Sequence, residues 1–520
     1  MIHTVETAAR LLELPAATLH AGDVAQVLGR LVPGDGSWLY RWDPNSTAGP
    51  NGGTVLAPAG MPAAGRWLLC HSGTVDARCF GVFGPDVPVD ALMADGSVTR
   101  IVFGTDVNFT RRHTFTRGHV TLDFTGHTVT AQGVEHAKHN DPFGALFHFT
   151  GVPGDDVRTF PLAQPMRELY DVFEVPGAGG IPLYSWWQVS VNSLAGREEK
   201  EIDKLLCVTE RIDESHVRVN YKMGWPLDAG RVMTWRRVEP IERVCVQDME
   251  FRGNEGGEET GAQPLAFEYA VRCDVRDVRA RHTYWPVLLR RHNTEYVTER
   301  CSLANPIEVV VGGTGYLTQQ IHCLYGKVRD CTTSNARHLN DFTGSAYCMV
   351  ENCHGDGDFH GAYVTHGQFE HDLTYVGNSG LLSFANSGPT WGSSAKRITV
   401  VRHTGFWGIG FAKVSDLTLQ DVAVCRTGAY DGVNTEGYGP CGTFLLNADG
   451  LQMRGCTAEK LVLTQRSRRA KRPAIVEGCW FRDGIEVVRT GEAAVAPGTP
   501  LILRDNLTGP GGPQQAEGTE

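Results

Sequence analysis

The densest cluster of acidic and histidine side chains in this sequence lies between positions 338 and 403. Apolar residues alternate along 369–375, so Glu370 and Asp372 are expected to share the opposite face of a strand. Two carboxylates at such positions lie roughly 6 to 7 Å apart, between the separations typical of retaining and inverting glycosidases. Their repulsion would raise the pKa of one of them, as a general acid requires. The pattern therefore permits acid/base hydrolysis of a glycosidic bond without settling its stereochemistry.

Neighbouring side chains are candidates for supporting roles. Asp356-Gly357-Asp358 supplies two more carboxylates, although this order of Asp and Gly is also typical of a turn. The competing interpretation is that the carboxylates only solvate an outer face, that the histidines are structural and that the aromatic rings pack beneath a loop. The expected catalytic side chains are Glu370, Asp372, Asp358, Asp356, His366 and Asp341. The expected substrate-binding side chains are His338, His371, Lys396, Trp391, Trp407 and Tyr375, whose aromatic members offer flat faces to sugar rings.

A short recurring phrase must position these side chains. It reads as an aliphatic residue, a free position, a small or acidic residue and a small apolar residue, and sharp copies end at Cys331, Cys353, Cys456 and Cys479. With looser copies, the final positions are 249, 278, 301, 331, 353, 376, 403, 422, 456, 479 and 506, with gaps of 19 to 34 residues. A constant phrase at variable spacing indicates stacked coils with fixed strands and free loops. We predict an all-β fold, a right-handed parallel β-helix of about 11 or more coils.

The 14 cysteines favour a reduced interior over disulfides. Five of them occupy the final slot of the phrase or its equivalent, where side chains of successive coils would point inward and pack as small hydrophobic groups. The zinc-type CxxC spacing is absent from the sequence. No metal or cofactor is therefore expected, with a structural or lyase-type Ca²⁺ left open. The five cysteines are Cys301, Cys331, Cys353, Cys456 and Cys479.

Changes in rhythm and composition divide the chain into five regions. Residues 1–85 are expected to form a helical and capping or particle-attachment module, with a helical stretch over 5–31. The expected regions after it are the first coils at 86–154, a β-rich insertion on the flank at 155–240, the main β-helix at 241–507 and a flexible tail at 508–520.

Charge and hydropathy narrow the range of partners. The net charge of −11 argues against a nucleic-acid partner, which usually requires a basic face. No run of eighteen apolar residues is present, so no membrane span is expected. The N-terminal stretch carries acidic residues and lacks a continuous apolar core, so we expect no secretion signal and release by another route such as lysis.

Two stretches of the chain carry distinctive motifs. Segments containing Trp42-Asp43-Pro44, Gly52-Gly53-Thr54 and Gly65-Arg66-Trp67 precede a Phe-Gly turn at 80–84. This order resembles the N-terminal capping module of phage tailspikes and related pectate-lyase-superfamily β-helix proteins. Residues 338–400 contain Val-Glu-Asn-Cys-His-Gly-Asp at 350–356, Thr-His-Gly-Gln-Phe-Glu-His-Asp at 365–372 and Ala-Asn-Ser-Gly at 385–388. These motifs resemble a recurring segment of phage-associated β-helix proteins from prophages of Gram-positive bacteria. The acidic Gly-Asp-Gly pattern of the tailspike family is reduced here to Pro-Asp-Val-Pro-Val-Asp at 85–90.

The resemblance implies a homotrimeric tail protein of a virion, attached to other tail proteins through its N-terminal module. We expect it to bind a host surface polysaccharide and to cleave it as an endo-glycosidase with paired carboxylates. One alternative is a non-catalytic structural or adhesion protein of the particle that uses the same surface only for binding. The other is a polysaccharide lyase, in which Lys396 or Ca²⁺ would neutralise the substrate's charge. No HExxH motif or mononucleotide-binding loop is present.

Overall fold

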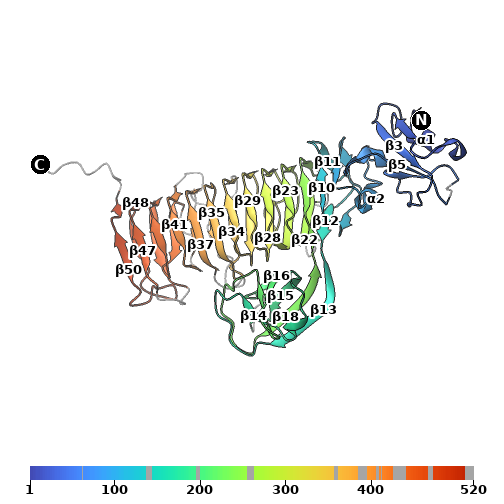
Figure 1. The fold of residues 1–520 in the computed structure, drawn as a ribbon. Helices are drawn as coiled ribbons and strands as arrows, with labels where there is room; N and C mark the ends of the chain where they lie inside the picture. The colour runs from blue at the N-terminus through green and yellow to red at the C-terminus, as the bar shows by residue number, and fades with distance from the viewer. Residues whose placement is uncertain are drawn as a thin grey trace.

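The chain forms an elongated parallel β-helix with a separate sheet at its N-terminal end and a small domain on its flank (Figure 1). The predicted all-β parallel β-helix is therefore confirmed. One hydrophobic core runs along the β-helix from Val75 to Val495. The computed structural model describes residues 1–60, 63–135, 143–194, 199–253, 263–355, 361–384, 395–405, 409–411, 413–425, 441–466 and 472–509.

The longest sheet has 15 strands and carries most of the predicted repeat. Its neighbours pair in parallel, so side chains at equivalent positions of successive coils stack in rows. The strands are β6 (Thr74–Asp76), β7 (Arg100–Val102), β10 (Val120–Asp123), β20 (Val244–Gln247), β23 (Asp274–Arg276), β26 (Val297–Glu299), β29 (Lys327–Arg329), β32 (Met349–Glu351), β35 (His371–Val376), β37 (Ala395–Val401), β40 (Val414–Ser415), β41 (Thr418–Gln420), β44 (Gln452–Arg454), β47 (Ala474–Glu477) and β50 (Leu501–Arg504).

Two further faces close each coil. The second face runs from β8 (Val107–Asn108) to β33 (His354–Gly355) and resumes from β38 (Thr404–Gly405) to β51 (Leu507–Thr508). The third face runs from β9 (His113–Phe115) through β12 (Phe147–Thr150) and β31 (His338–Thr343) to β36 (Leu382–Phe384), and resumes from β39 (Ile409–Phe411) to β49 (Ile485–Val487).

The recurring phrase marks the corner where each coil leaves the long sheet. Its third residue has a left-handed backbone, with φ of +55° at Asp330, +48° at Asn352 and +60° at Gly455. This conformation favours Gly, Asn and Asp. The left-handed backbone therefore explains why the third position of the phrase is usually a small or acidic residue.

The cysteines stack inside the β-helix as predicted. Cys301, Cys331 and Cys353 are at most 2% exposed. The backbone N–H of Cys301 donates to Cys331 Sγ at 3.4 Å, and that of Cys331 donates to Cys353 Sγ at 3.5 Å. Cys456 and Cys479 repeat the arrangement at 3.4 Å, and all of these cysteines are free thiols.

One coil differs from the predicted repeat. Val376 pairs with the outward-facing Glu351 rather than filling the inward slot. Asn378 occupies that slot instead, and its side chain accepts a hydrogen bond from the backbone N–H of Cys353 at 2.8 Å. The assignment of position 376 is therefore wrong, because Gly377 rather than Tyr375 makes the left-handed bend of this coil.

The N-terminal module is mostly β rather than helical. The expected helix over 5–31 is reduced to α1 (Ala8–Leu12), and the second half of that stretch contains β2 (Val24–Val27). Gly22 turns the chain with φ of +84°, so that β2 pairs with both of its neighbours. Strand pairing therefore overrides the helical pattern. The other strands of this sheet are β1 (Ile2–Val5), β3 (Trp38–Asp43), β4 (Val55–Leu56) and β5 (Arg66–Leu69); α2 (Val89–Ala94) follows at the start of the β-helix.

A six-stranded antiparallel sheet forms the flank domain, which we call the insertion. It packs against the corner between the third face and the long sheet, where Tyr269, His292 and His322 stack with ring centroids 5.2 and 5.4 Å apart. Asp203 of the insertion contacts His292 Nε2 at 2.9 Å. The strands are β13 (Val152–Pro161), β14 (Val172–Glu174), β15 (Trp186–Val191), β16 (Asp203–Arg211), β17 (His216–Val219) and β18 (Val232–Glu239).

Candidate active site

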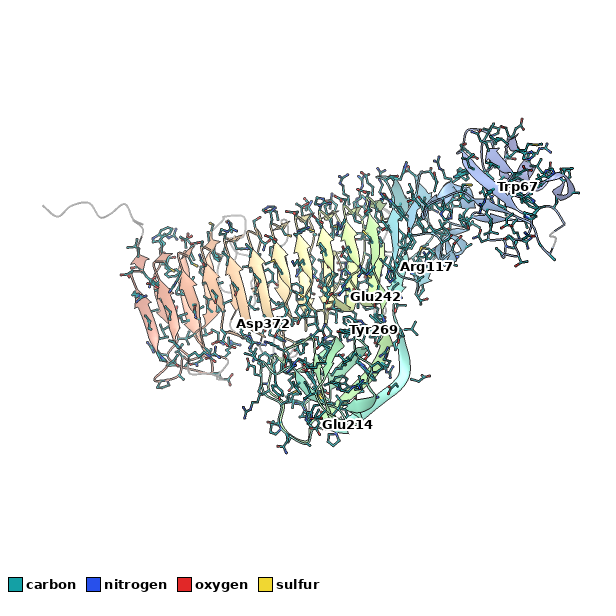
Figure 2. The ribbon with its side chains drawn as sticks, in the orientation of Figure 1. Trp67, Arg117, Glu214, Glu242, Tyr269 and Asp372 are labelled. Carbon is teal, nitrogen blue, oxygen red and sulfur yellow. The ribbon has the colours of Figure 1, made fainter. Side chains whose placement is uncertain are left out.

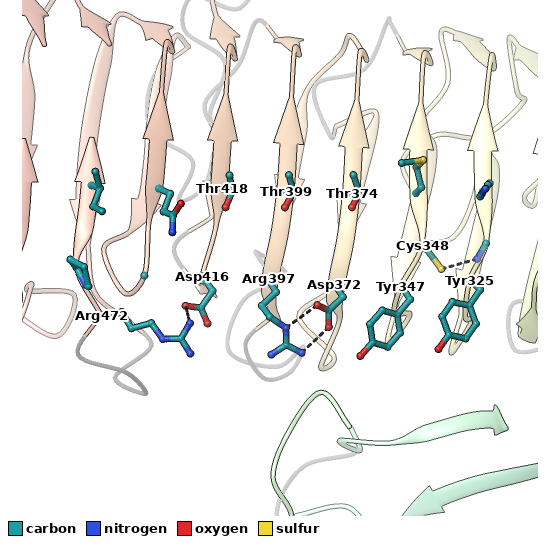
Figure 3. Close-up of a pocket in the computed structure, with 17 residues that line it drawn as sticks. Tyr325, Tyr347, Cys348, Asp372, Thr374, Arg397, Thr399, Asp416, Thr418 and Arg472 are labelled. Atoms are coloured by element: carbon teal, nitrogen blue, oxygen red, sulfur yellow. Dashed lines mark hydrogen bonds and ion pairs between the residues drawn. The ribbon is translucent and has the colours of Figure 1, made fainter. Parts of the chain in front are cut away.

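A groove of about 740 Å³ follows the edge of the long sheet (Figure 3). Asp372, which lines it, lies on the side of the β-helix that faces the insertion (Figure 2). The floor of the groove is made by outward side chains at matching register, Thr374, Thr399 and Thr418, followed by Gln452. Hydroxyl and amide groups therefore repeat at the strand spacing of about 4.8 Å. The wall is formed by a row of corner side chains that we call the corner row: Tyr325, Tyr347, Asp372, Arg397 and Asp416.

The corner row combines large side chains with a left-handed backbone. All five residues have φ between +52° and +55°. This conformation costs on the order of 1 kcal/mol for most residues other than Gly, Asn and Asp. Backbone preference therefore does not account for the two tyrosines and the arginine.

The two tyrosines form an aromatic end of the groove. Their rings stack with centroids 5.4 Å apart and planes inclined by 17°. Tyr325 donates its hydroxyl to the carbonyl of Asn220 at 2.6 Å, and Tyr347 donates to that of Lys222 at 3.0 Å. Both acceptors belong to the insertion, so the insertion fixes the orientation of these rings.

The Asp372 carboxylate of the corner row is held by hydrogen bonds from two neighbouring side chains. Its Oδ2 lies 2.7 Å from His371 Nδ1, and Arg397 donates to Oδ1 at 2.9 Å and to Oδ2 at 2.7 Å. Burial alone would raise the pKa of Asp372, but the hydrogen bonds from His371 and Arg397 outweigh it and lower the pKa to about 2. Asp372 is therefore ionised at every pH at which the protein would work.

The pKa of Asp416 is shifted in the opposite direction from that of Asp372. Burial raises its pKa, and the nearby Asp449 carboxylate adds to the rise, although Arg472 at 2.7 Å opposes it. The Asp416 side chain is 16% exposed, so it still reaches the groove. Two carboxylates with pKa values pushed apart are the arrangement expected of an acid and a base in one site.

The insertion contributes a charge beside the row. Glu168 contacts Lys396 Nζ at 2.7 Å and also pairs with Arg397. Burial would raise the pKa of Glu168, but these two cations lower it. Lys396 is 3% exposed, with its Nζ 4.1 Å from the centre of the Trp225 ring. Its contacts are therefore within the protein, and its expected role in binding substrate directly is wrong.

The predicted pair of Glu370 and Asp372 does not share an outer face. Glu370 is fully buried and accepts hydrogen bonds from the backbone N–H groups of Gly344 at 2.9 Å and Gln368 at 2.8 Å. Burial raises its pKa. The left-handed φ of +65° at Phe369 and +53° at Asp372 interrupts strand alternation, so Glu370 points into the corner while Asp372 faces the groove.

Other predicted residues come together away from the groove. His366 Nε2 lies 2.9 Å from Oδ2 of the fully buried Asp341, within the third face. His338 is 4% exposed, hydrogen-bonded to the carbonyl of Gly361 and packed on Tyr316. These side chains support the coil rather than line the groove.

His371 and Tyr375 are also buried. Both are 0% exposed, so the expected stacking of Tyr375 on a sugar ring and the direct contact of His371 with substrate are wrong. The remaining predicted site residues, Asp356, Asp358, Trp391 and Trp407, lie outside the described residues, as does nearly all of the expected flexible tail.

A sequence signal for the corner row does exist. Each member lies three residues before the inward aliphatic or aromatic position of its coil, as Tyr325 does before Val328 and Asp416 before Leu419. Comparing this position coil by coil gives Tyr, Tyr, Asp, Arg and Asp. Glu168 has no such signal, because no repeat relates the insertion to the coils.

Two general features of the described part of the chain bear on the site. None of its helices combines the length and apolar character that crossing a membrane requires. Among the same residues, no group of three or more His, Cys, Asp or Glu side chains is arranged to hold a metal ion.

No protein-family model matches this sequence, and no curated protein matches it either. Solved structures do resemble it. The Gp54 tailspike of Acinetobacter baumannii bacteriophage AP22, in complex with A. baumannii capsular saccharide, matches with a TM-score of 0.52 at 10% identity over 84% of this chain and 67% of that one. The tailspike protein gp49 of Pseudomonas phage LKA1 matches with a TM-score of 0.50 at 14% identity over 77% of this chain and 69% of that one. The chain therefore has the parallel β-helix fold of phage tailspikes.

Proposed function

We propose that this chain is a tailspike-type protein that binds a host surface polysaccharide in the groove along the corner row. The observation that carries the proposal is the groove itself, with its threonine floor, its tyrosine pair and its charged wall. One coil adds about 4.8 Å along the groove, which is close to the length of one sugar unit in an extended chain. The AP22 tailspike, which shares the fold, is described in complex with a capsular saccharide, and this supports the same ligand class here.

Hydrolysis is the activity that the charged wall supports best. Asp416, with its raised pKa, would protonate the leaving oxygen, and the ionised Asp372 would activate water. They lie two coils apart, roughly 9 to 10 Å from the strand spacing. This estimate lies at the upper end of the separation typical of inverting enzymes. We therefore expect cleavage with inversion.

The test uses the full chain and purified capsular or cell-wall polysaccharides from a panel of bacterial hosts. We expect new reducing ends from wild type, and loss of cleavage with retained binding for Asp416→Asn and Asp372→Asn. Asp421→Asn is the matched control, because Asp421 also has a left-handed backbone but lies at the opposite corner. Binding without cleavage by wild type would favour the adhesion alternative, an unsaturated product would favour a lyase, and no binding would refute the proposal.

The assembly follows from the same proposal. We infer a homotrimer in a phage tail, joined to other tail proteins through residues 1–85. Light scattering coupled to size exclusion should give three times the mass of one chain, and a monomer at micromolar concentration would contradict it.

A further inference from the structure

A buried chain of hydrogen bonds joins the insertion to the groove. Tyr221 of the insertion lies with its Oη 2.8 Å from His371 Nε2, and both side chains are almost fully buried. The other ring nitrogen, His371 Nδ1, lies 2.7 Å from Asp372 Oδ2. The insertion therefore reaches the carboxylate in the groove through one intervening imidazole.

The chemistry of the three groups fixes the direction of these bonds. An ionised carboxylate can only accept, so His371 must carry its proton on Nδ1. Burial lowers the pKa of His371 to about 4, so the ring is neutral and its Nε2 is an acceptor. Tyr221 then donates its hydroxyl hydrogen to Nε2. Only this one proton arrangement satisfies all three side chains.

The surrounding residues pack closely against this imidazole. A Cβ added at Gly224 would lie 2.2 Å from His371 Cδ2, so only glycine fits there without displacing the ring. Trp225, next in the chain, packs edge-on against Phe369 with ring centroids 5.3 Å apart. The loop after β17 thus clamps His371 from the insertion side.

A second contact holds the other side of the same carboxylate. Arg397 donates to both oxygens of Asp372 and also pairs with Glu168 of the insertion. The insertion therefore acts on Asp372 along two independent routes, one through His371 and one through Arg397.

We propose that Tyr221 and His371 are positioning residues that set the orientation of Asp372 in the groove, which makes the insertion a working part of the site. The proposal rests on the function proposed above for Asp372. Its first test is a matched pair of substitutions. His371→Asn puts an amide N–H near the place of Nδ1 and retains a donor to Asp372. His371→Gln puts its amide near the place of Nε2 and leaves Asp372 without that donor.

Both variants remove the ring and should lose similar thermal stability. We expect His371→Gln to lose about 10- to 100-fold in kcat, the range expected for a misplaced reacting group, with KM little changed. His371→Asn should retain several-fold more activity, and Tyr221→Phe should fall between wild type and His371→Gln. In His371→Gln, the acidic limb of the pH–rate profile should move to higher pH, because a donor that lowers the pKa of Asp372 is gone. Equal kcat for the Asn and Gln variants, or unchanged kcat for Tyr221→Phe, would overturn the proposal.

A measurement without glycan separates this inference from the function itself. We expect Tyr221→Phe to lower the melting temperature of wild type by more than it lowers that of Asp372→Asn, because the two residues are coupled through His371. Equal shifts in both backgrounds would overturn the positioning role whether or not a substrate is found. If wild type cleaves none of the glycans while this coupling is present, the proposed hydrolysis fails and the positioning of Asp372 stands.

Discussion

Asp416 lies directly against Gly450 of the next coil. A Cβ added at Gly450 would lie 2.3 Å from Asp416 Oδ1 and 3.2 Å from its Cα. Gly450 has φ of +79° and stands in the coil position that the corner row fills elsewhere. The absence of a side chain at Gly450 therefore leaves the space that the Asp416 carboxylate uses.

Gly450→Ala should accordingly impair cleavage by displacing Asp416. We expect a loss of about 100-fold in kcat, since small misplacements of a reacting group have effects of this size. The left-handed backbone should also cost on the order of 1 kcal/mol in unfolding free energy. Gly484→Ala is the control, because Gly484 has φ of +88° and no neighbouring atom within 4 Å of the added Cβ. Equal kcat in the two variants would show that Asp416 does not need this space.

Two substitutions of Tyr347 should have separate effects on glycan binding and on the stability of the fold. Tyr347→Phe keeps the ring but loses the hydrogen bond to Lys222, so it should cost about 1 kcal/mol in unfolding free energy and leave glycan affinity unchanged. Tyr347→Ala should weaken glycan binding by about 0.5–1.5 kcal/mol, or roughly two- to tenfold. Calorimetric titration and denaturant unfolding measure the two effects. Tyr184→Ala, at an exposed tyrosine of the insertion, should change neither.

Arg472 should set the basic limb of the pH–rate profile. Asp416 acts as an acid only while protonated, so kcat falls as pH rises through its raised pKa. Arg472 lowers that pKa, and Arg472→Gln should therefore move the basic limb to higher pH. Arg482→Gln, which changes an arginine paired with Asp483 at the surface, serves as the control. A limb that stays in place would show that Asp416 is not the group that titrates.

The coils were predictable because the recurring phrase reflects two structural requirements of each coil. Its third residue makes a left-handed bend, and its last residue points inward. The site was less predictable because the same bend interrupts the alternation used to assign faces. Asp372 was correctly expected to face outward, whereas Glu370, two residues earlier, is buried beyond a left-handed Phe369. The ion pair between Glu168 and Arg397 forms only because the insertion docks on the β-helix in the folded chain, and the sequence carries no sign of that contact.

The docked insertion also predicts a pH-dependent stability. Lys204 of β16 is 3% exposed between the insertion and the β-helix. Burial lowers its pKa from the ordinary 10.5 to about 8, although Asp203 opposes the shift. Between these two values the unfolded chain binds a proton that the folded chain has lost, so this residue's contribution to stability rises with pH across that window. Below pH 8 the cost of the buried charge is fully present.

Lys204→Met removes this cost without removing the apolar stem. We expect the variant to be more stable than wild type at pH 7, and its advantage to shrink by pH 10. Urea unfolding of both proteins at the two pH values measures the difference, in which the titrations of all other groups largely cancel. Lys222→Met is the control, because Lys222 is exposed and its substitution should give a difference that does not change with pH. An advantage for Lys204→Met that is the same at both pH values would mean that the ammonium group is not desolvated in the folded protein.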